Sequence, residues 1–145
     1  MKKVKKLYGL ICFLAIFLTV SGMSSIEGDS PEGVPVPAKK FSAIIVDQAD
    51  VRSEVDSFSI DGFTFISGNR GKGTFSIAFD KLESIDFRFL DERLEALINL
   101  KEGRTIALEV DKNLDCYGRT DFGTYRIKLG DIKRLVIETR SKPTY

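Results

Sequence analysis

Hydrophobic and polar residues alternate one by one along much of the chain between residues 41 and 140. In "FSIAF", Phe75, Ile77 and Phe79 fall on one face of an extended segment, and small residues fall on the other. Successive side chains of a strand point to opposite faces, so a period of two indicates half-buried strands. The same alternation recurs in "ESIDFRF" (83–89) and "RTIALEVD" (104–111). The pattern predicts a mainly β domain.

One segment fits two interpretations. In "DERLEALINL" (91–100), Leu94 and Leu97 are three residues apart, a spacing that a helical turn would use. The second half of the segment fits a strand equally well. We expect at most one turn of α-helix in the domain, at this place.

Two segments of the domain match each other at a constant offset of fifty residues, "GTFSIAFDKLESIDF" (73–87) and "GTYRIKLGDIKRLVI" (123–137). The apolar positions are kept, whereas the polar positions vary. The matched pairs are Phe75 with Tyr125, Ile77 with Ile127, Phe79 with Leu129, Leu82 with Ile132, Ile85 with Leu135, and Phe87 with Ile137. This pattern predicts a duplicated β unit, with repeat one over 41–90 and repeat two over 91–140.

In each repeat a short break, Asp80-Lys81 or Gly130-Asp131, separates two expected strands and suits a 3₁₀ turn. Five short strands with a 3₁₀ turn before the last resemble SH3-like and Sm-like small β-barrels. The resemblance covers each repeat and lies in the rhythm of strands. It implies two tandem five-stranded small barrels packed together, and the alternative is a single ten-stranded barrel or sandwich. No ligand site follows from it.

The start of the chain has the pattern of a secretory signal peptide. Four lysines among the first six residues precede an uncharged run over 7–20, and small residues follow at 21–25. The uncharged run is shorter than the ~20 residues that a membrane-spanning helix needs, which argues against the alternative of an uncleaved anchor. Cys12 lies inside the run and not at its end, so a lipid anchor is not expected. We therefore predict a signal peptide over 1–23 and a periplasmic or secreted protein.

The segment 24–40 differs in composition from the rest of the chain. It contains Pro31, Pro35 and Pro37 together with two glycines. Such a segment cannot form a central strand and is typical of an extended, partly stiff tether. The folded domain is expected to begin near Phe41.

The charge balance argues against two classes of partner. The chain has 22 basic and 21 acidic residues, and loss of the four leader lysines leaves 18 basic residues and a net charge of about −3. A slightly acidic domain has no electrostatic reason to bind nucleic acid or an anionic membrane. We expect neither as a partner once the leader is removed.

The inventory of reactive residues argues against catalysis. The chain has no histidine, and Cys116 is the one cysteine outside the leader. A nucleophilic cysteine needs a histidine partner or a setting that lowers its pKa, so we expect Cys116 to be a buried apolar side chain. We predict no catalytic residues and no cofactor.

The stretch "SGNRGKGT" (67–74) has the composition of a phosphate-binding loop but lacks the G-x-x-x-x-G-K-[ST] spacing. Its counterpart, "GRTDFG" (118–123), has an aspartate and no lysine. Both stretches fit glycine-flanked connections between strands. The expected turn glycines are Gly68 and Gly73 in the first stretch and Gly118 and Gly123 in the second. Gly73 and Gly123 are expected to have a positive φ.

The stretch "DKNLD" (111–115) begins like a calcium loop. The sixth and twelfth positions of an EF-hand loop are glycine and glutamate, whereas Cys116 and Phe122 stand there in this chain. We predict no metal site, with Asp111, Asn113 and Asp115 as weak candidates only. The favoured interpretation is a turn with Asn113 in a left-handed conformation.

These observations favour an exported, non-catalytic β-domain that acts as a protein-interaction or structural module of the cell envelope. Its expected partner is an envelope or extracytoplasmic protein, bound through loops or strand edges. The alternative is a β-domain that binds a small ligand or a metal in a cleft between the repeats. An enzyme is not expected.

Overall fold

The computed structural model describes residues 34–35 and 37–139, which form ten strands and two short 3₁₀ turns. The mainly β prediction is confirmed. The strands are β1 (Ser42–Asp47), β2 (Arg52–Ile60), β3 (Phe65–Arg70), β4 (Gly73–Ala78), β5 (Leu82–Leu90), β6 (Arg93–Leu100), β7 (Thr105–Val110), β8 (Asp115–Thr120), β9 (Gly123–Lys128) and β10 (Ile132–Glu138). The 3₁₀ turns are η1 (Phe79–Lys81) and η2 (Leu129–Asp131), at the two predicted breaks. The expected signal peptide and most of the expected tether lie outside the described residues.

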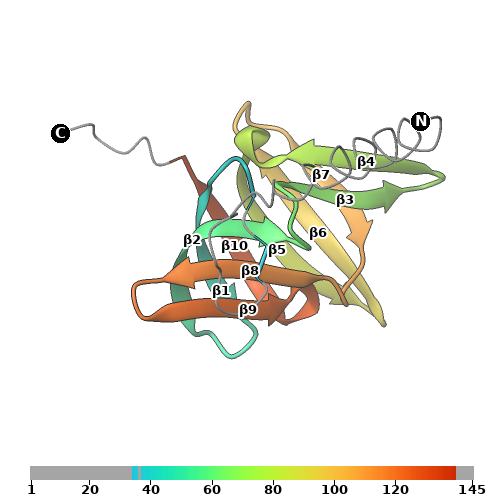
Figure 1. Ribbon diagram of the computed structural model, residues 1–145. Coiled ribbons are helices and arrows are strands. Elements are labelled where there is room, and N and C mark those ends of the chain that lie inside the picture. The colour runs from blue at the N-terminus through green and yellow to red at the C-terminus, as the bar shows by residue number, and fades with distance from the viewer. Residues whose placement is uncertain (1–33, 36, 140–145) are drawn as a thin grey trace, which may run out of the picture. The chain divides into compact units, whose positions relative to one another are not determined.

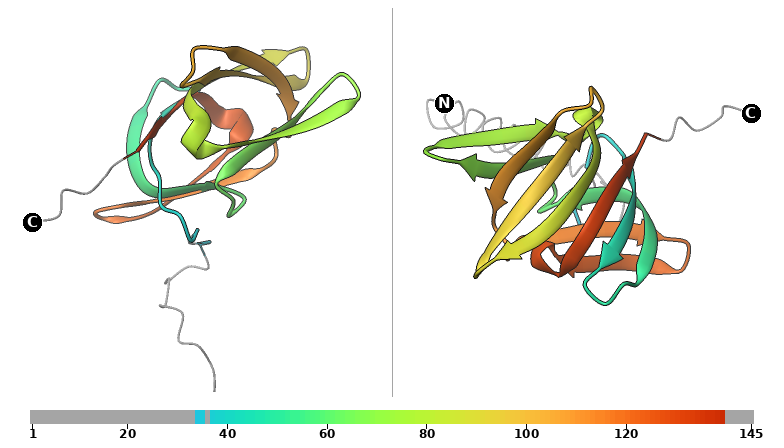
Figure 2. Two further views of the ribbon diagram at one scale, coloured as in Figure 1. Left: turned by 90° about the horizontal axis from the view of Figure 1, so that it is seen from above. Right: turned by 180° about the vertical axis from the view of Figure 1, so that it is seen from behind.

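The ten strands form one curled antiparallel sheet in the order β4-β3-β7-β6-β5-β10-β1-β2-β8-β9 (Figures 1 and 2). Strands of the two fifty-residue segments interleave in this order, because β7 pairs with β3 and β2 pairs with β8. The segments therefore do not close as two separate barrels. One ten-stranded sheet shared by both segments agrees with the alternative of a single ten-stranded barrel better than with two tandem barrels. None of the helices in the described part is long and apolar enough to cross a membrane.

The sheet has equivalent halves. The bounds of β3, β4 and η1 recur fifty residues later as those of β8, β9 and η2. When each element is exchanged for its counterpart, the strand order reverses and is otherwise unchanged. Counterparts meet at the centre, where β5 pairs with β10 and Ile85 lies opposite Leu135. This equivalence is structural, and duplication of an ancestral unit remains a prediction.

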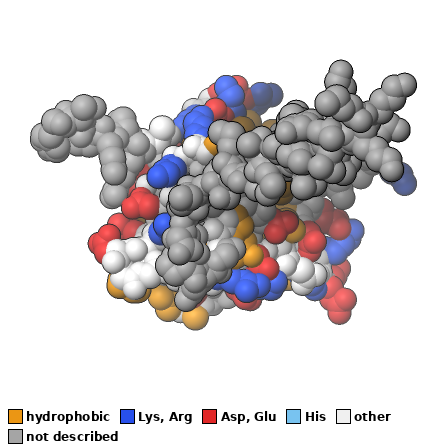
Figure 3. Space-filling model, viewed as in Figure 1, with side chains coloured by type: hydrophobic (Ala, Val, Ile, Leu, Met, Phe, Trp, Pro, Cys, Tyr) orange, Lys and Arg blue, Asp and Glu red, His pale blue; other side chains and the backbone are white. Residues whose placement is uncertain are grey.

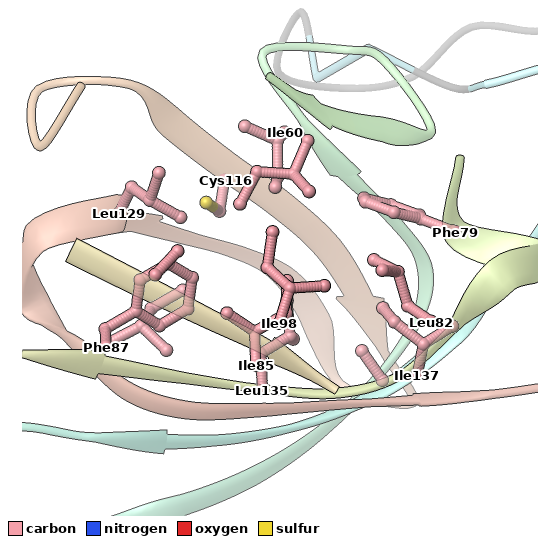
Figure 4. Packing of buried hydrophobic residues seen from close by; sticks show 14 of the residues in the cluster. Ile60, Phe79, Leu82, Ile85, Phe87, Ile98, Cys116, Leu129, Leu135 and Ile137 are labelled. Carbon is pink, nitrogen blue, oxygen red and sulfur yellow. The ribbon is translucent and has the colours of Figure 1, made fainter. Parts of the chain in front are cut away.

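The core is built from four of the six matched apolar pairs, whereas the pairs Phe75–Tyr125 and Ile77–Ile127, on the edge strands, are not fully buried. Phe79 and Leu129 are fully buried, as are Leu82 and Ile132 and the central pair of Ile85 and Leu135. Figure 4 shows several of these side chains pointing into one shared interior. Phe79 also stacks on Phe58 with 5.6 Å between the ring centroids. Because side chains from both halves fill the same interior, they form a single core.

The helical interpretation of 91–100 is wrong. Residues Arg93–Leu100 form strand β6, which pairs with β5 on one side and with β7 on the other. Leu94, Ala96, Ile98 and Leu100 alternate as its buried positions. Leu97 lies on the opposite face, so the three-residue spacing from Leu94 has no structural meaning.

The turn interpretation of Gly68 and Gly118 is also wrong, because these glycines lie within strands β3 and β8. A Cβ atom on Gly68 would lie 2.7 Å from the carbonyl oxygen of Glu109 in β7. A Cβ atom on Gly118 would lie 2.7 Å from Cβ of Val55 in β2. The glycines are needed for the close approach of the two strand pairs that interleave the halves.

Gly73 and Gly123 begin strands β4 and β9, and neither has the positive φ expected from the sequence. The positive φ of the first hairpin, +62°, is at Gly71. Arg70 pairs with Gly73, so Gly71 and Lys72 form a two-residue loop. Such a loop with a positive φ at its first position matches a type II′ turn.

These contacts predict a contrast among glycine substitutions. Gly68→Ala and Gly118→Ala should each lower the free energy of unfolding by ~1–3 kcal/mol or more, because a methyl group at either position overlaps a neighbouring strand. Gly123→Ala meets no atom within 4 Å and should change that free energy by no more than about 0.5 kcal/mol. Urea denaturation of the three variants measures the difference, and equal costs would contradict it.

Candidate functional site

The curled sheet ends in two edge strands, β4 and β9, which occupy equivalent places in the two halves. In Figures 1 and 2 the β3–β4 hairpin projects away from the rest of the sheet. Strand β4 has the sequence Gly-Thr-Phe-Ser-Ile-Ala, and all of its residues except Ile77 are exposed. It contains no charged residue. Natural proteins usually protect an exposed edge with charge or proline, so this edge is unusual.

Alternate residues of β4 direct their backbone groups away from β3. The pair Arg70 and Gly73 flanks a two-residue loop, which makes it a hydrogen-bonded pair. Farther along, the N–H of Phe79 donates to the carbonyl oxygen of Thr64 at 3.0 Å. The odd-numbered residues of β4 are therefore the ones that hydrogen-bond to β3. Thr74, Ser76 and Ala78 therefore point their N–H and C=O groups toward the open side of the edge.

The side chains of β4 leave this edge accessible. Ser76 Oγ lies 2.6 Å from Ser67 Oγ, and the Thr74 hydroxyl donates to Asn69 Oδ1 at 2.9 Å. Both side chains thus turn back toward β3. On the opposite face of β4, Phe75 and Ile77 line a groove of about 560 Å³. Leu100 and Ile106 continue its apolar lining, and its other lining residues are charged: Asp80, Lys81, Lys101, Glu102 and Arg104. Phe75 is 46% exposed there.

Strand β9 has the same position in the other half but an ionic edge. Arg126 and Lys128 stand where β4 has Ser76 and Ala78. The Arg126 guanidinium donates to both carboxylate oxygens of Asp115, at 3.0 and 2.9 Å, and Lys128 Nζ lies 3.0 Å from the same carboxylate. The hydrogen bonds from Arg126 and then Lys128 hold the pKa of Asp115 below its ordinary value.

The weak metal candidates do not form a site. Asp111 Oδ1 accepts a hydrogen bond from the Asn113 N–H at 2.9 Å, which makes an Asx turn, and Asp115 is bound to Arg126 and Lys128. Asn113 lacks the left-handed conformation predicted for it, since the Asx hydrogen bond forms the turn without a positive φ. Within 34–35 and 37–139, no three acidic or cysteine side chains are grouped to hold a metal ion.

Cys116 is fully buried, as the sequence predicts, and burial raises the pKa of its thiol to about 12. At neutral pH the group is a thiol and not the thiolate that a nucleophile requires.

A second groove lies beside β2 and the β8–β9 hairpin. It has a volume of about 450 Å³, and its polar lining includes Ser53, Asp56, Thr120, Tyr125 and Glu138. Burial raises the pKa of the Tyr125 hydroxyl. The charged lining of this groove is mainly acidic, with four carboxylates and two cations: Glu54, Asp56, Asp121, Glu138, Arg52 and Arg119. It is the geometry on which a small-ligand function would rest.

The surface charge is mixed. Among the coloured atoms of Figure 3, acidic and basic side chains are interspersed, with small groups of apolar side chains between them.

The sequence contains the information that distinguishes the two edges, because "GTFSIA" and "GTYRIK" differ in charge at two positions. This difference in charge is informative only if both segments are known to be edge strands. The alternation of apolar and polar residues does not show which strands lie at the edges.

A protein-family model described as "Uncharacterised protein" matches residues 37–140, a range that spans all ten strands. The chain belongs to this family. A protein of Aquifex aeolicus (strain VF5), described as "Uncharacterized protein", is 22% identical over 113 residues, which cover 77% of this chain and 86% of that protein. No solved structure matches the chain.

The ion pairs of β9 predict a pH dependence. The lowered pKa of Asp115 means that its contribution to stability is present above its ordinary pKa of 3.8 and is lost as the pH falls through the lowered value. Asp115→Asn should therefore lower Tm at pH 6, and the difference from the wild type should shrink as the pH falls below 3.8. Asp111→Asn is the control, because an amide oxygen can still accept the turn hydrogen bond. A difference for Asp115→Asn that grows on acidification would contradict this assignment.

Proposed function

We propose that this chain is an exported, non-catalytic β-domain that acts as a protein-interaction or structural module of the cell envelope. The observation that carries the proposal is the exposed, uncharged edge of β4. An extended partner segment can add to such an edge as a further strand. Main-chain hydrogen bonds then supply affinity, and alternate side chains supply specificity.

Strand β4 offers what strand addition requires. Thr74, Ser76 and Ala78 direct six main-chain groups outward, and their side chains are small. Phe75 and Ile77 add apolar surface next to the backbone, and Leu100 and Ile106 extend it. Strand β9 is the poorer docking edge, because a partner would have to approach Arg126 and Lys128.

The proposed compartment rests on the leader pattern of residues 1–23 and the proline-containing segment 24–40. In this proposal the segment tethers the domain, and the partner is a protein of the envelope or the extracytoplasmic space. The raised pKa of Cys116 and the lack of histidine support a non-catalytic role. The mixed surface charge and the slightly acidic mature chain disfavour nucleic acid and anionic membrane as partners.

The alternative function is binding of a small ligand, and the groove beside β2 favours it as a specific observation. A thermal-shift screen with small polar compounds and calcium separates the two candidates, since a ligand of the native state raises Tm by mass action. A substitution at Tyr125 should abolish any such shift, whereas substitutions on β4 should leave it unchanged.

Export predicts a shortened chain. The protein recovered from an extracytoplasmic fraction should have an intact mass that lacks the first twenty or so residues, because signal peptidase cuts after the small residues near position 23. Mass spectrometry of the fractionated cells is the measurement. A chain that begins at Met1 and stays in the cytoplasm would refute the proposed compartment.

Use of the β4 edge predicts where partners cross-link. A photo-crosslinking amino acid at Ser76 should capture a protein in intact cells, whereas the same residue at Arg126, its counterpart on β9, should not. Ser76→Arg combined with Ala78→Lys gives β4 the charges of β9 and should abolish the capture through a second probe at Thr74. Both residues are exposed, and the variant removes the contact between the Ser76 and Ser67 hydroxyls, so the free energy of unfolding of the single chain should fall by about 1 kcal/mol or less. Equal capture at positions 76 and 126 would contradict the proposal.

A further inference from the structure

We infer that the segment which adds to β4 is the β4 strand of a second copy of this chain, so that two sheets join about a twofold axis. This inference rests on the proposed function of the β4 edge and specifies its partner. It requires that β4 be self-complementary in its backbone, its side chains and its charges.

One register uses all of the outward backbone groups of β4. When two copies of one strand pair antiparallel about a twofold axis, residues opposite each other have their side chains on the same face of the joined sheet. Their residue numbers must therefore be both even or both odd. Pairing Ser76 with Ser76 of the second copy and Thr74 with Ala78 of the second copy meets this condition. It joins the outward backbone groups of all three residues, with two hydrogen bonds for each of three pairs.

The side chains fit this register on both faces. Thr74, Ser76 and Ala78 are small, so one face of the joined strands carries no bulky contact. On the other face, Phe75 would lie opposite Ile77 of the second copy, and the reverse contact is made by symmetry. This places an apolar side chain against the Phe75 ring, which is 46% exposed in the single chain.

Charges at the ends of β4 are complementary in the same register. Lys72 precedes the strand and Asp80 follows it, and both are exposed. Antiparallel pairing centred on Ser76 places Lys72 at the end of the partner strand that carries Asp80. Asp80 lies 3.2 Å from Lys39 and is also within reach of Lys81 and Lys101, so Lys72 of the second copy would add a weak, solvent-exposed attraction to this carboxylate.

The chain already joins its two halves in this manner. Strands β5 and β10 are counterparts, and they pair antiparallel with the equivalent residues Ile85 and Leu135 at the centre. A β4–β4 junction would repeat that arrangement between two molecules. The result is a closed pair, because each molecule uses the same edge.

The second edge disfavours its own self-pairing. In the corresponding register, Arg126 would lie opposite Arg126 of the second copy and Thr124 opposite Lys128. Like charges directly opposite each other destabilise a strand pair. Because a β4–β4 pair uses the same edge of both molecules, association through β4 should stop at two copies.

Cysteine cross-linking tests both the partner and the register. In the full chain with Cys12→Ser, oxidation of Ser76→Cys should give a disulfide-linked dimer, because hydrogen-bonded antiparallel neighbours have Cα atoms ~5.5 Å apart, within disulfide range. Arg126→Cys, the matched control on β9, should stay monomeric on reducing-agent-free gels. Buried Cys116 is common to every variant and should not react. A mixture of Thr74→Cys and Ala78→Cys should form mixed dimers, and neither variant alone should cross-link.

Sedimentation of the uncross-linked chain gives the independent measurement. The wild type should be dimeric at micromolar concentration, and Ser76→Arg, which places two cations at the twofold axis, should raise Kd by about tenfold or more. A wild type that is monomeric throughout this range, or a Thr74→Cys variant that cross-links to itself as well as to Ala78→Cys, overturns the inference. If the wild type is monomeric but the photoprobe at position 76 captures another protein, self-pairing is refuted while the proposed function stands. Capture of nothing at position 76 refutes both.

Discussion

The close approach of β7 to Gly68 and of β2 to Gly118 is the constraint on which the sheet depends. Without a Cβ atom at these positions, each strand can lie against a strand from the other half of the chain, and the two halves interleave. Neither half then has a complete set of neighbours, since β3 needs β7 and β8 needs β2. The core is accordingly shared, and its folding should be a single cooperative transition. Many pairings join residues far apart in the chain, a topology associated with slow folding.

An interleaved sheet of this kind is curled but has two ends, and each end presents a row of unpaired backbone groups. The two ends solve this problem differently. Strand β9 carries Arg126 and Lys128, which both pair with Asp115 within the molecule. Strand β4 carries no charge and leaves its outward backbone groups accessible. An uncharged exposed edge is an aggregation hazard for a protein with no use for it, which is the physical reason to regard β4 as an interface.

Much of the fold can be predicted from the sequence, because period-two alternation and the fifty-residue offset depend only on which side chains face the core. The strands, the 3₁₀ turns at Asp80-Lys81 and Gly130-Asp131, and the burial of Cys116 follow from such local patterns. The interleaved pairing does not, since alternation identifies the buried face of a strand and not its neighbour. For that reason the sequence patterns misassign residues whose roles depend on the neighbouring strand. They place Gly68 and Gly118 in turns, and they allow a helical turn in the segment that forms β6.

The difference between the edges extends one strand into the sheet. The first residue of β3 is Phe65, which lies opposite Ala78 and packs 5.1 Å from the ring of Phe63. Its counterpart in β8 is Asp115, which lies opposite Lys128. The shared core requires similar apolar residues at the inward positions of both halves, but it places no such requirement on these outward positions. At these outward positions one half therefore has an apolar pair, Phe65 and Ala78, and the other half has a charged pair, Asp115 and Lys128. The two edges therefore differ in charge, because β9 carries ion pairs with its neighbour and β4 carries no charged residue.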